Sequence, residues 1–217
     1  MHINHTITKD LLDREMAKIQ KSSIINIEFN PKSKEILFLL GAVFAAGKQI
    51  NITNELELTP TKSFSNMVNH WSKNGLVAKI SNESFINKIF LICPVRDANL
   101  NQIEKMRSFV NNKAQEGYKV HYPLDHTNQL GDQIGYRICT ENANAIGDAK
   151  SVSIYYDQAS RGTMFDLGVA YYFQYLDPTR TFVLENAEDI VINPSDFGDT
   201  VVNIMQQKKL IKTLIKK

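Results

Sequence analysis

Apolar and polar residues alternate along the chain with two periods, one typical of buried strands and one typical of amphipathic helices. Short apolar runs predict strands at residues 24–29, 49–53, 88–93, 119–122, 152–156 and 181–184. Apolar residues spaced three and four apart predict helices at residues 6–21, 34–46, 61–73, 99–117, 131–149 and 164–173, and from residue 196 to the end. Because strands and helices alternate, we expect an α/β fold with a parallel sheet covered by helices.

Two stretches of the chain match when one is shifted by 127 residues (151 minus 24). Residues 24–41 then align with residues 151–168 without a gap, so that Ser33 falls on Ser160 and Gly41 on Gly168. Strand-turn-helix units resemble one another, so generic α/β chemistry is an alternative explanation. We interpret residues 1–86 as a degenerate half-repeat (helix-strand-helix-strand-helix) that packs on or completes a main domain at residues 87–217.

The clearest candidate chemistry follows the strand predicted at residues 152–156. A turn leads from this strand into a helix, which brings the Ser160 hydroxyl, the N–H groups around Gly162 and the Asp166 carboxylate to one end of the sheet. N–H groups at a helix N-terminus favour an anion. A carboxylate one turn into that helix is a candidate nucleophile or general base. The structural alternative is an N-cap serine followed by a solvated aspartate.

Composition and charge narrow the classes of function. The 217 residues are 43% hydrophobic and 22% charged, which is typical of a globular protein, and the net charge of +2 gives no reason to expect nucleic-acid binding. The longest apolar run, residues 36–46, is shorter than the roughly 20 residues that cross a bilayer, and the first residues do not resemble a signal peptide. We therefore expect a cytoplasmic protein without a membrane partner. Cys93 and Cys139 are far apart in the sequence, and we expect both to be free thiols. The five histidines lack the spacing of metal ligands, so we expect no metal.

Four short segments together carry a family resemblance. They are FLICP at residues 90–94, PLD at 123–125, NANAI at 142–146 and SRGTMFDLG at 160–168. In this order and spacing they resemble the nucleoside 2-deoxyribosyltransferase superfamily, and most closely its 2'-deoxynucleoside 5'-monophosphate N-hydrolases, which have a serine where Ser160 stands. The resemblance implies a Rossmann-like (flavodoxin-like) sheet and cleavage of the bond between base and deoxyribose. Because the carboxylate itself stabilises the oxocarbenium-like centre of such a reaction, we expect no cofactor.

The resemblance also implies roles for individual residues. Asp166 stands where the family has a glutamate that attacks the anomeric carbon and forms a covalent glycosyl intermediate. Asn142 stands where the family has an aspartate near the sugar. Ser160 corresponds to a residue that contacts phosphate. The other candidate substrate-binding residues are Ser65, Met67, Pro94, Arg96, Asp125, His126, Gly162 and Thr163.

Ser65 and Met67 raise the question of oligomeric state. They belong to a segment, residues 62–67, that is similar to one which in the family reaches into the neighbouring subunit's site. We expect a homodimer or higher homo-oligomer, or a half-copy that supplies this segment within the same chain. Each of these residues also has a purely structural interpretation. Met67 and Trp71 would be core residues, Arg96 would belong to a solvated surface pair, and His126 would simply be exposed.

We expect an N-glycosidase that acts on a nucleoside or nucleoside 5'-monophosphate, with Asp166 as the nucleophile. Hydrolysis and transfer to a second base both remain open. The alternatives are a non-catalytic nucleotide-binding or sensor protein on a retired hydrolase fold, and an NAD-type N-glycosidase.

Overall fold

The main sheet has four parallel strands in the order β4-β3-β5-β6. Their bounds are β3 Phe85–Ile92, β4 Lys119–His121, β5 Ala149–Ile154 and β6 Thr181–Leu184. The computed structural model describes residues 7–96, 98–132 and 134–215, and for residues 207–215 the helical backbone alone. Phe90, Leu91 and Ile92 are fully buried, as expected for a strand covered on both faces. This arrangement confirms the predicted Rossmann-like (flavodoxin-like) fold.

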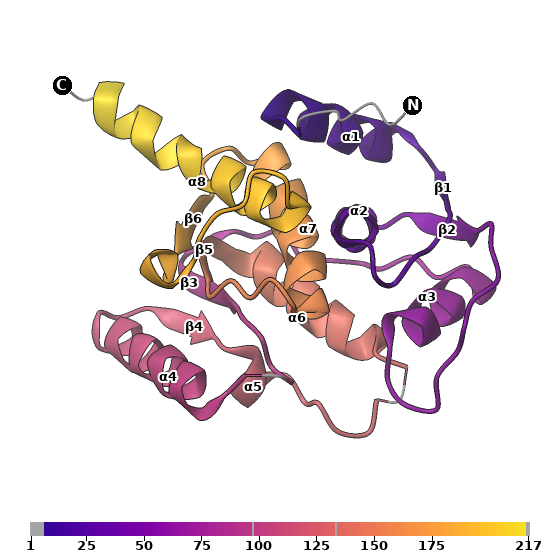
Figure 1. Cartoon of the computed structure of the whole chain (residues 1–217), viewed down its shortest axis with the longest axis horizontal. Coiled ribbons are helices and arrows are strands. Elements are labelled where there is room, and N and C mark those ends of the chain that lie inside the picture. Colours follow the sequence, from indigo (N-terminus) through magenta and orange to yellow (C-terminus); the bar gives the residue numbers. More distant parts are fainter. Residues whose placement is uncertain (1–6, 97, 133, 216–217) are drawn as a thin grey trace.

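Helices cover both faces of this sheet (Figure 1). The helices of the main unit are α4 Leu100–Gln115, α5 Pro123–His126, α6 Tyr136–Asp148, α7 Arg161–Leu176 and α8 Phe197–Ile215. The chain steps one way from β3 to β4 and the other way through β5 to β6. Because such crossovers are right-handed, α4 lies on one face, and α6 and α7 lie on the other. Helix α7 contacts both β3 and α2, so it stands between the sheet and the N-terminal part of the chain.

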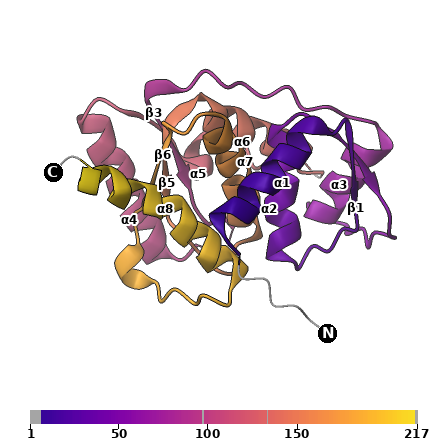
Figure 2. The ribbon, with the colours of Figure 1, turned by 90° about the horizontal axis from the view of Figure 1, so that it is seen from above.

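The N-terminal part is a smaller unit of the same kind. Its elements are α1 Lys9–Lys21, β1 Ile24–Ile27, α2 Lys34–Ala45, β2 Gln49–Ile52 and α3 Phe64–Lys73. The strands β1 and β2 pair in parallel as a separate two-stranded sheet. Figures 1 and 2 show this unit (indigo to purple) beside α7, on the side away from the main sheet. One hydrophobic core contains residues of both units, and the predicted domain boundary after residue 86 falls within β3.

The N-terminal unit repeats the second half of the main unit in its strand register. The predicted shift of 127 residues places the 13-residue helix α1 on the 13-residue helix α6. Ile24 of β1 pairs with Gln49 of β2, and at the equivalent place Ser151 of β5 pairs with Thr181 of β6. The structure thus confirms an N-terminal half-copy of the unit β5-α7-β6.

The same side-chain contact closes both pairs of strands. Asn54 accepts a hydrogen bond from the Phe29 N–H (2.7 Å) and donates one to the Phe29 carbonyl (3.0 Å). Asn186 makes both bonds with Tyr156, each at 2.9 Å. Asn54 and Asn186 both follow the second strand of their units. Each holds the backbone of the residue two places after the first strand of the same unit. Generic α/β packing does not require this contact, so its repetition supports duplication.

The two copies meet through α2 and α7, and the contact is reciprocal. A Cβ atom on Gly41 would lie under 3.0 Å from the carbonyl group of Phe165, and one on Gly168 would lie under 3.0 Å from the carbonyl group of Phe38. Gly41 and Gly168 are equivalent under the 127-residue shift, and so are Phe38 and Phe165. The helices therefore cross with approximate two-fold symmetry, at two glycines that permit close backbone approach.

Several predicted boundaries differ from the observed ones for local reasons. The helix predicted at residues 61–73 begins at Phe64, because Ser63 is its N-cap. The helix predicted from residue 131 begins at Tyr136, because Asp132 accepts hydrogen bonds from the N–H groups of Ile134, Gly135 and Ile138 and holds a turn there. Helix α7 is longer than predicted at both ends. The short helix α5 stands where the sequence indicated a loop.

The other predicted segments are shifted by a few residues. Strands predicted at 24–29 and 152–156 end earlier, and β3 and β5 begin earlier than predicted, because a strand ends where its pairing ends rather than where its apolar run does. Among the described residues, no helix has the length and apolar content needed to cross a membrane.

Candidate functional site

Asp166 lies in the second turn of α7 and faces a cavity of about 500 Å³. The residue is only 7% exposed. The cavity lies between the N-terminal turns of α3 and α7, the chain that follows β3, and helix α6. Its apolar walls are contributed by Phe64, Met67, Cys93, Val95, Ile138, Cys139 and Phe165. The predicted strand-turn-helix unit thus places a carboxylate at the wall of a cavity.

A chain of hydrogen bonds connects Asp166 with the end of β4. The Asn142 side-chain amide donates to Oδ2 of Asp166 (3.3 Å), and the Thr127 hydroxyl donates to Oδ1 of Asn142 (2.8 Å). Thr127 in turn contacts Nε2 of His121 at 3.0 Å. Since the Thr127 proton points to Asn142, its oxygen accepts from His121, whose Nε2 therefore carries a proton. This chain fixes the Asn142 amide with its NH₂ group toward Asp166.

His121 and Thr127 were not among the predicted site residues. Burial, together with the charge of His126, lowers the pKa of His121 to about 4, so the imidazole is neutral at pH 7. Thr127 is buried and holds Asn142 in place. A threonine in a polar loop carries no sequence signal for such a role, because its partners are His121 and Asn142, which belong to other elements.

Burial controls the ionisation of the acidic groups at the cavity. It raises the pKa of Asp166 to about 7, and the hydrogen bond from Asn142 acts in the opposite direction. Burial, and secondly the charge of Asp166, also raises the pKa values of the Cys93 and Cys139 thiols. Both thiols are therefore protonated at neutral pH and poor nucleophiles. The raised pKa of Asp166 means that this carboxyl group titrates near neutrality.

The lining of the cavity also contains three positively charged side chains. They are Lys62, Arg96 and Arg161. Arg96 donates a hydrogen bond to the carbonyl of Lys62 (3.3 Å), and the Lys62 ammonium donates to the side chain and the carbonyl of Gln129 (both 3.2 Å). Desolvation and, secondly, the charge of Arg96 lower the pKa of Lys62. Three cations at one cavity favour an anionic ligand.

The N-terminus of α7 opens onto the same cavity. Ser160 is the N-cap, and its hydroxyl accepts a hydrogen bond from the Thr163 N–H (3.3 Å). A Cβ atom added at Gly162 would meet nothing within 4 Å, so the backbone there is accessible to a ligand. The first turn of α7 contains no acidic residue. An anion near Gly162 would therefore face free N–H groups and the positive end of the helix dipole.

The structure brings some of the predicted site residues together and separates others. Six line this cavity: Met67, Arg96, Asn142, Ser160, Gly162 and Asp166. Thr163 is fully buried beneath the helix end, and Ser65 is buried within α3. Asp125 and His126 are exposed in α5, where Asp125 forms an ion pair with Arg107 (3.5 Å). Instead of Ser65, the N-cap residue Ser63 faces the cavity, because α3 begins at Phe64.

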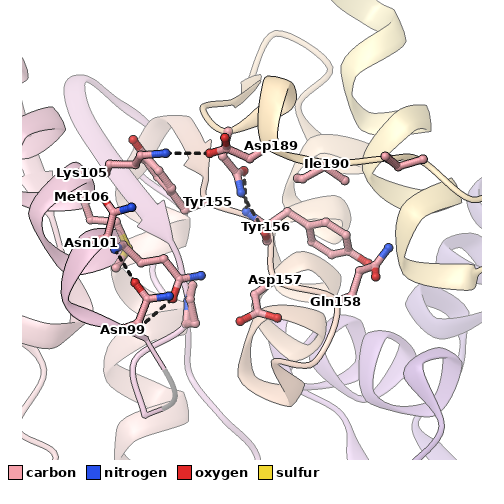
Figure 3. A pocket seen from close by; sticks show the side chains of 14 residues that line it. Asn99, Asn101, Lys105, Met106, Tyr155, Tyr156, Asp157, Gln158, Asp189 and Ile190 are labelled. Atoms are coloured by element: carbon pink, nitrogen blue, oxygen red, sulfur yellow. Dashed lines mark hydrogen bonds and ion pairs between the residues drawn. The ribbon is translucent and has the colours of Figure 1, made fainter.

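Pro94 lines a second cavity of about 540 Å³ instead. Figure 3 shows this cavity with Tyr155, Tyr156 and Asp157 beside it. Tyr155, Asn99 and Asp157 surround this space, and Lys105 closes one end through an ion pair with Asp189 at 3.0 Å. Lys105 and Asp189 are exposed, and the half-buried Asp157 accepts a hydrogen bond from the Ala159 N–H (2.8 Å). The carboxylate of Asp166 is buried, and burial raises its pKa to about 7, so we place the candidate site at Asp166.

Comparisons with protein-family models, with curated proteins and with solved structures find no match to this chain. The described residues contain no cluster of three or more His, Cys, Asp or Glu side chains that could hold a metal ion. The site is therefore interpreted from its own geometry.

Proposed function

We propose that the protein is an N-glycosidase that cleaves the bond between base and deoxyribose in a nucleoside or nucleoside 5'-monophosphate, with Asp166 as the nucleophile. The observation that carries this proposal is a buried carboxylate at the wall of a cavity, held by one hydrogen bond from Asn142. Its Oδ1 atom accepts no hydrogen bond from any described residue and is free to approach a sugar carbon. The family resemblance of the four sequence segments supports the same reaction.

The reaction follows in two steps. An oxygen of the ionised Asp166 forms a bond to the anomeric carbon, while the C–N bond breaks and its electron pair leaves with the base, which takes up a proton. Water, or a second base, then attacks the same carbon and releases Asp166 as a carboxylate. With water as the acceptor, the products are the free base and the deoxyribose or its phosphate.

The surrounding residues would prepare Asp166 for this role. Burial keeps water from solvating the carboxylate, which strengthens its interaction with the positive charge that develops on the sugar. Asn142, held by Thr127, fixes the position of one carboxylate oxygen. Arg96, Ser160 and the accessible N–H groups near Gly162 would receive a 5'-phosphate.

Release of free base tests the proposal directly. The purified protein is incubated with each deoxynucleoside and each deoxynucleoside 5'-monophosphate, and the products are separated by chromatography. We expect base release by the wild type and none by Asp166→Ala. Asp189→Ala, which removes an exposed carboxylate at the second cavity, is the matched control and should retain activity. If no substrate yields base while Asp166→Ala binds nucleotides as the wild type does, the proposal is wrong.

One observation favours a non-catalytic nucleotide-binding protein as a second candidate. Glycosidases of the usual kind employ two carboxyl groups, one of them as an acid for the leaving group. Among the described residues that line this cavity, Asp166 is the only carboxylate, against three cations. Asp166→Glu distinguishes the candidates: an enzyme limited by a short nucleophile keeps or gains turnover, whereas a binding protein shows ligand-dependent melting shifts and no product in either form.

A further inference from the structure

The proposed cleavage leaves the source of one proton open. When the C–N bond breaks, its electron pair leaves with the base, and the base departs more easily if it is protonated at the same time. Glycosidases usually take this proton from a second carboxyl group. Among the described residues that line the cavity, Asp166 is the only carboxylate, and it serves as the nucleophile. The proton therefore has to come from another kind of side chain or from water.

Most of the other polar side chains of the cavity are poor proton donors. The thiols of Cys93 and Cys139 hold their protons, because burial raises their pKa values. The guanidinium groups of Arg96 and Arg161 do not lose a proton in proteins. The hydroxyl and amide groups of the lining are weaker acids than the thiols. Of the described groups that line the cavity, this leaves the ammonium group of Lys62.

Lys62 lies shortly before α3, and contacts with its surroundings hold it at the cavity. Its ammonium group donates hydrogen bonds to the carbonyl and to the side-chain oxygen of Gln129, both at 3.2 Å. Its stem packs on Gly135, where an added Cβ atom would lie 3.3 Å from Cγ of Lys62. The Lys62 carbonyl accepts a hydrogen bond from Arg96 (3.3 Å). Because an ammonium group has three protons and Gln129 accepts two, one is available to a ligand.

The partners of Lys62 are uncharged, unlike those of the ion-paired lysines. Lys88, for example, is held by the carboxylate of Asp148 at 2.8 Å, and loss of its proton would leave that carboxylate without a counter-charge. Lys62 forms no ion pair with a described residue. A neutral amine still has two N–H groups, so Lys62 can lose a proton and still donate to both oxygens of Gln129.

The surroundings of Lys62 also favour loss of the proton. Desolvation is the main cause that lowers its pKa, and the charge of Arg96 comes second. Asp132 and Cys139 act in the opposite direction, whereas the charge of Arg137 lowers the pKa further. The net effect is a pKa below the ordinary value, so Lys62 is a stronger acid than an exposed lysine.

We propose that Lys62 is the general acid of the cleavage and donates the proton that the leaving base takes up. The inference rests on the proposed function and assigns a residue to the proton transfer. As Asp166 bonds to the anomeric carbon and the C–N bond breaks, a proton passes from the ammonium group to the base. The neutral amine then takes a proton from the attacking water, whose oxygen bonds to the same carbon and releases Asp166. Both side chains thereby return to their starting states.

Two kinds of leaving group test this inference. An ordinary purine departs slowly unless it is protonated, whereas an N7-methylated purine is already positively charged in its nucleoside and leaves without a proton. Lys62→Arg keeps the positive charge and the donors for Gln129 but cannot give up a proton. We expect it to lower kcat for the purine substrate that the wild type cleaves fastest by about 100-fold or more. Release of the N7-methylated base, measured above its spontaneous rate, should be nearly unchanged.

The pH profile distinguishes a proton donor from a charge that only attracts the substrate. If the ammonium proton is required, the wild-type kcat falls as pH rises through the pKa of Lys62. This alkaline fall should be absent in Lys62→Arg, while the rise through the pKa of Asp166 stays. Lys105→Arg, the same substitution in an exposed ion pair at the second cavity, is the matched control and should change neither rate nor profile. Both variants should melt near the wild type.

The outcomes separate this inference from the proposed reaction. If Asp166→Ala releases no base but Lys62→Arg cleaves both kinds of substrate at the wild-type rate and with the wild-type pH profile, the N-glycosidase proposal stands and Lys62 is not its acid. If Lys62→Arg slows both kinds of substrate equally, through KM or kcat, Lys62 acts in binding and the inference is wrong. If the wild type releases no base from any substrate, the proposed reaction is wrong and the inference falls with it.

Discussion

The two copies of the strand-helix-strand unit share a scaffold but differ where chemistry takes place. Register, the asparagine contacts and the serine N-caps are the same in both. Asp166, however, corresponds to Leu39, and Gly162 corresponds to Glu35, whose side chain accepts a hydrogen bond from Ser33 at the helix start. In the first copy the chain fills its own helix end with a carboxylate, and in the second a glycine leaves that space open. A duplicated unit can thus retain its packing while only one copy retains a candidate site.

The largest expected effect comes from replacing Asp166 with the residue that stands at the equivalent position of the first copy. Asp166→Leu installs the residue of position 39 and removes the only carboxylate among the described residues that line the cavity. We expect base release to fall by about 10³-fold or more, because the nucleophile is lost and not merely displaced. Chromatographic assay of free base measures this loss. The reciprocal Leu39→Asp should not create activity, and residual turnover near the wild-type level in Asp166→Leu would remove Asp166 from the mechanism.

The next effect concerns pH and stability. The pKa of Asp166 rises from 3.8 in the unfolded chain to about 7 in the folded protein, so folding favours its protonated form. The protonated carboxyl therefore contributes fully to the free energy of unfolding below pH 4. This contribution, up to about 4 kcal/mol, is lost as pH rises through 7. Asp166→Asn stays neutral, so its advantage in melting temperature over the wild type should grow between pH 4 and pH 8. A pH-independent difference would contradict a buried carboxyl with a raised pKa.

The glycines at the crossing of α2 and α7 test the two-fold contact itself. Gly41→Ala and Gly168→Ala each place a Cβ atom against a backbone carbonyl that cannot move aside. We expect each to lower the free energy of unfolding by about 3 kcal/mol, by similar amounts if the contact is reciprocal. Gly162→Ala meets no neighbour and is the matched control, with unchanged or slightly higher stability. Urea denaturation measures all three variants.

The smallest expected effect is a displaced pH profile. The hydrogen bond from Asn142 lowers the pKa of Asp166, so Asn142→Ala should raise it and move the rise of activity with pH to higher values. At pH 7 the rate should fall about two- to tenfold and recover at higher pH. Steady-state rates between pH 5 and pH 9 measure this effect. A lower rate at every pH, without displacement of the profile, would assign Asn142 to substrate contact alone.

The same comparison shows how a single chain can build the cavity. The sequence led us to expect a homo-oligomer or a half-copy acting within one chain. In the structure, α3 of the N-terminal unit supplies Ser63, Phe64 and Met67 to the cavity that holds Asp166. The described cavity is therefore made from one copy of the chain. The expectation of a homo-oligomer stays a prediction.

Local sequence determined the elements of this protein and the position of its principal carboxylate. The alternation of apolar strands and amphipathic helices fixed the α/β class, and the repeat was visible because Ser33 with Ser160 and Gly41 with Gly168 keep the same spacing. Ser160, Gly162 and Asp166 lie within one turn-helix segment, so their proximity follows from local geometry alone.

Only the tertiary structure decided which distant residues join that segment. Ser63 rather than Ser65 faces the cavity because of where α3 begins, and Thr127 and His121 reach Asp166 through Asn142 across three elements. The ion pair between Lys34 and Asp196 likewise joins residues that are far apart in the chain. Hydrophobic periodicity is a local property, whereas the meeting of distant residues at one cavity depends on how helices cross. Here the crossing of α2 and α7 is set by Gly41 and Gly168, each of which packs against the other helix.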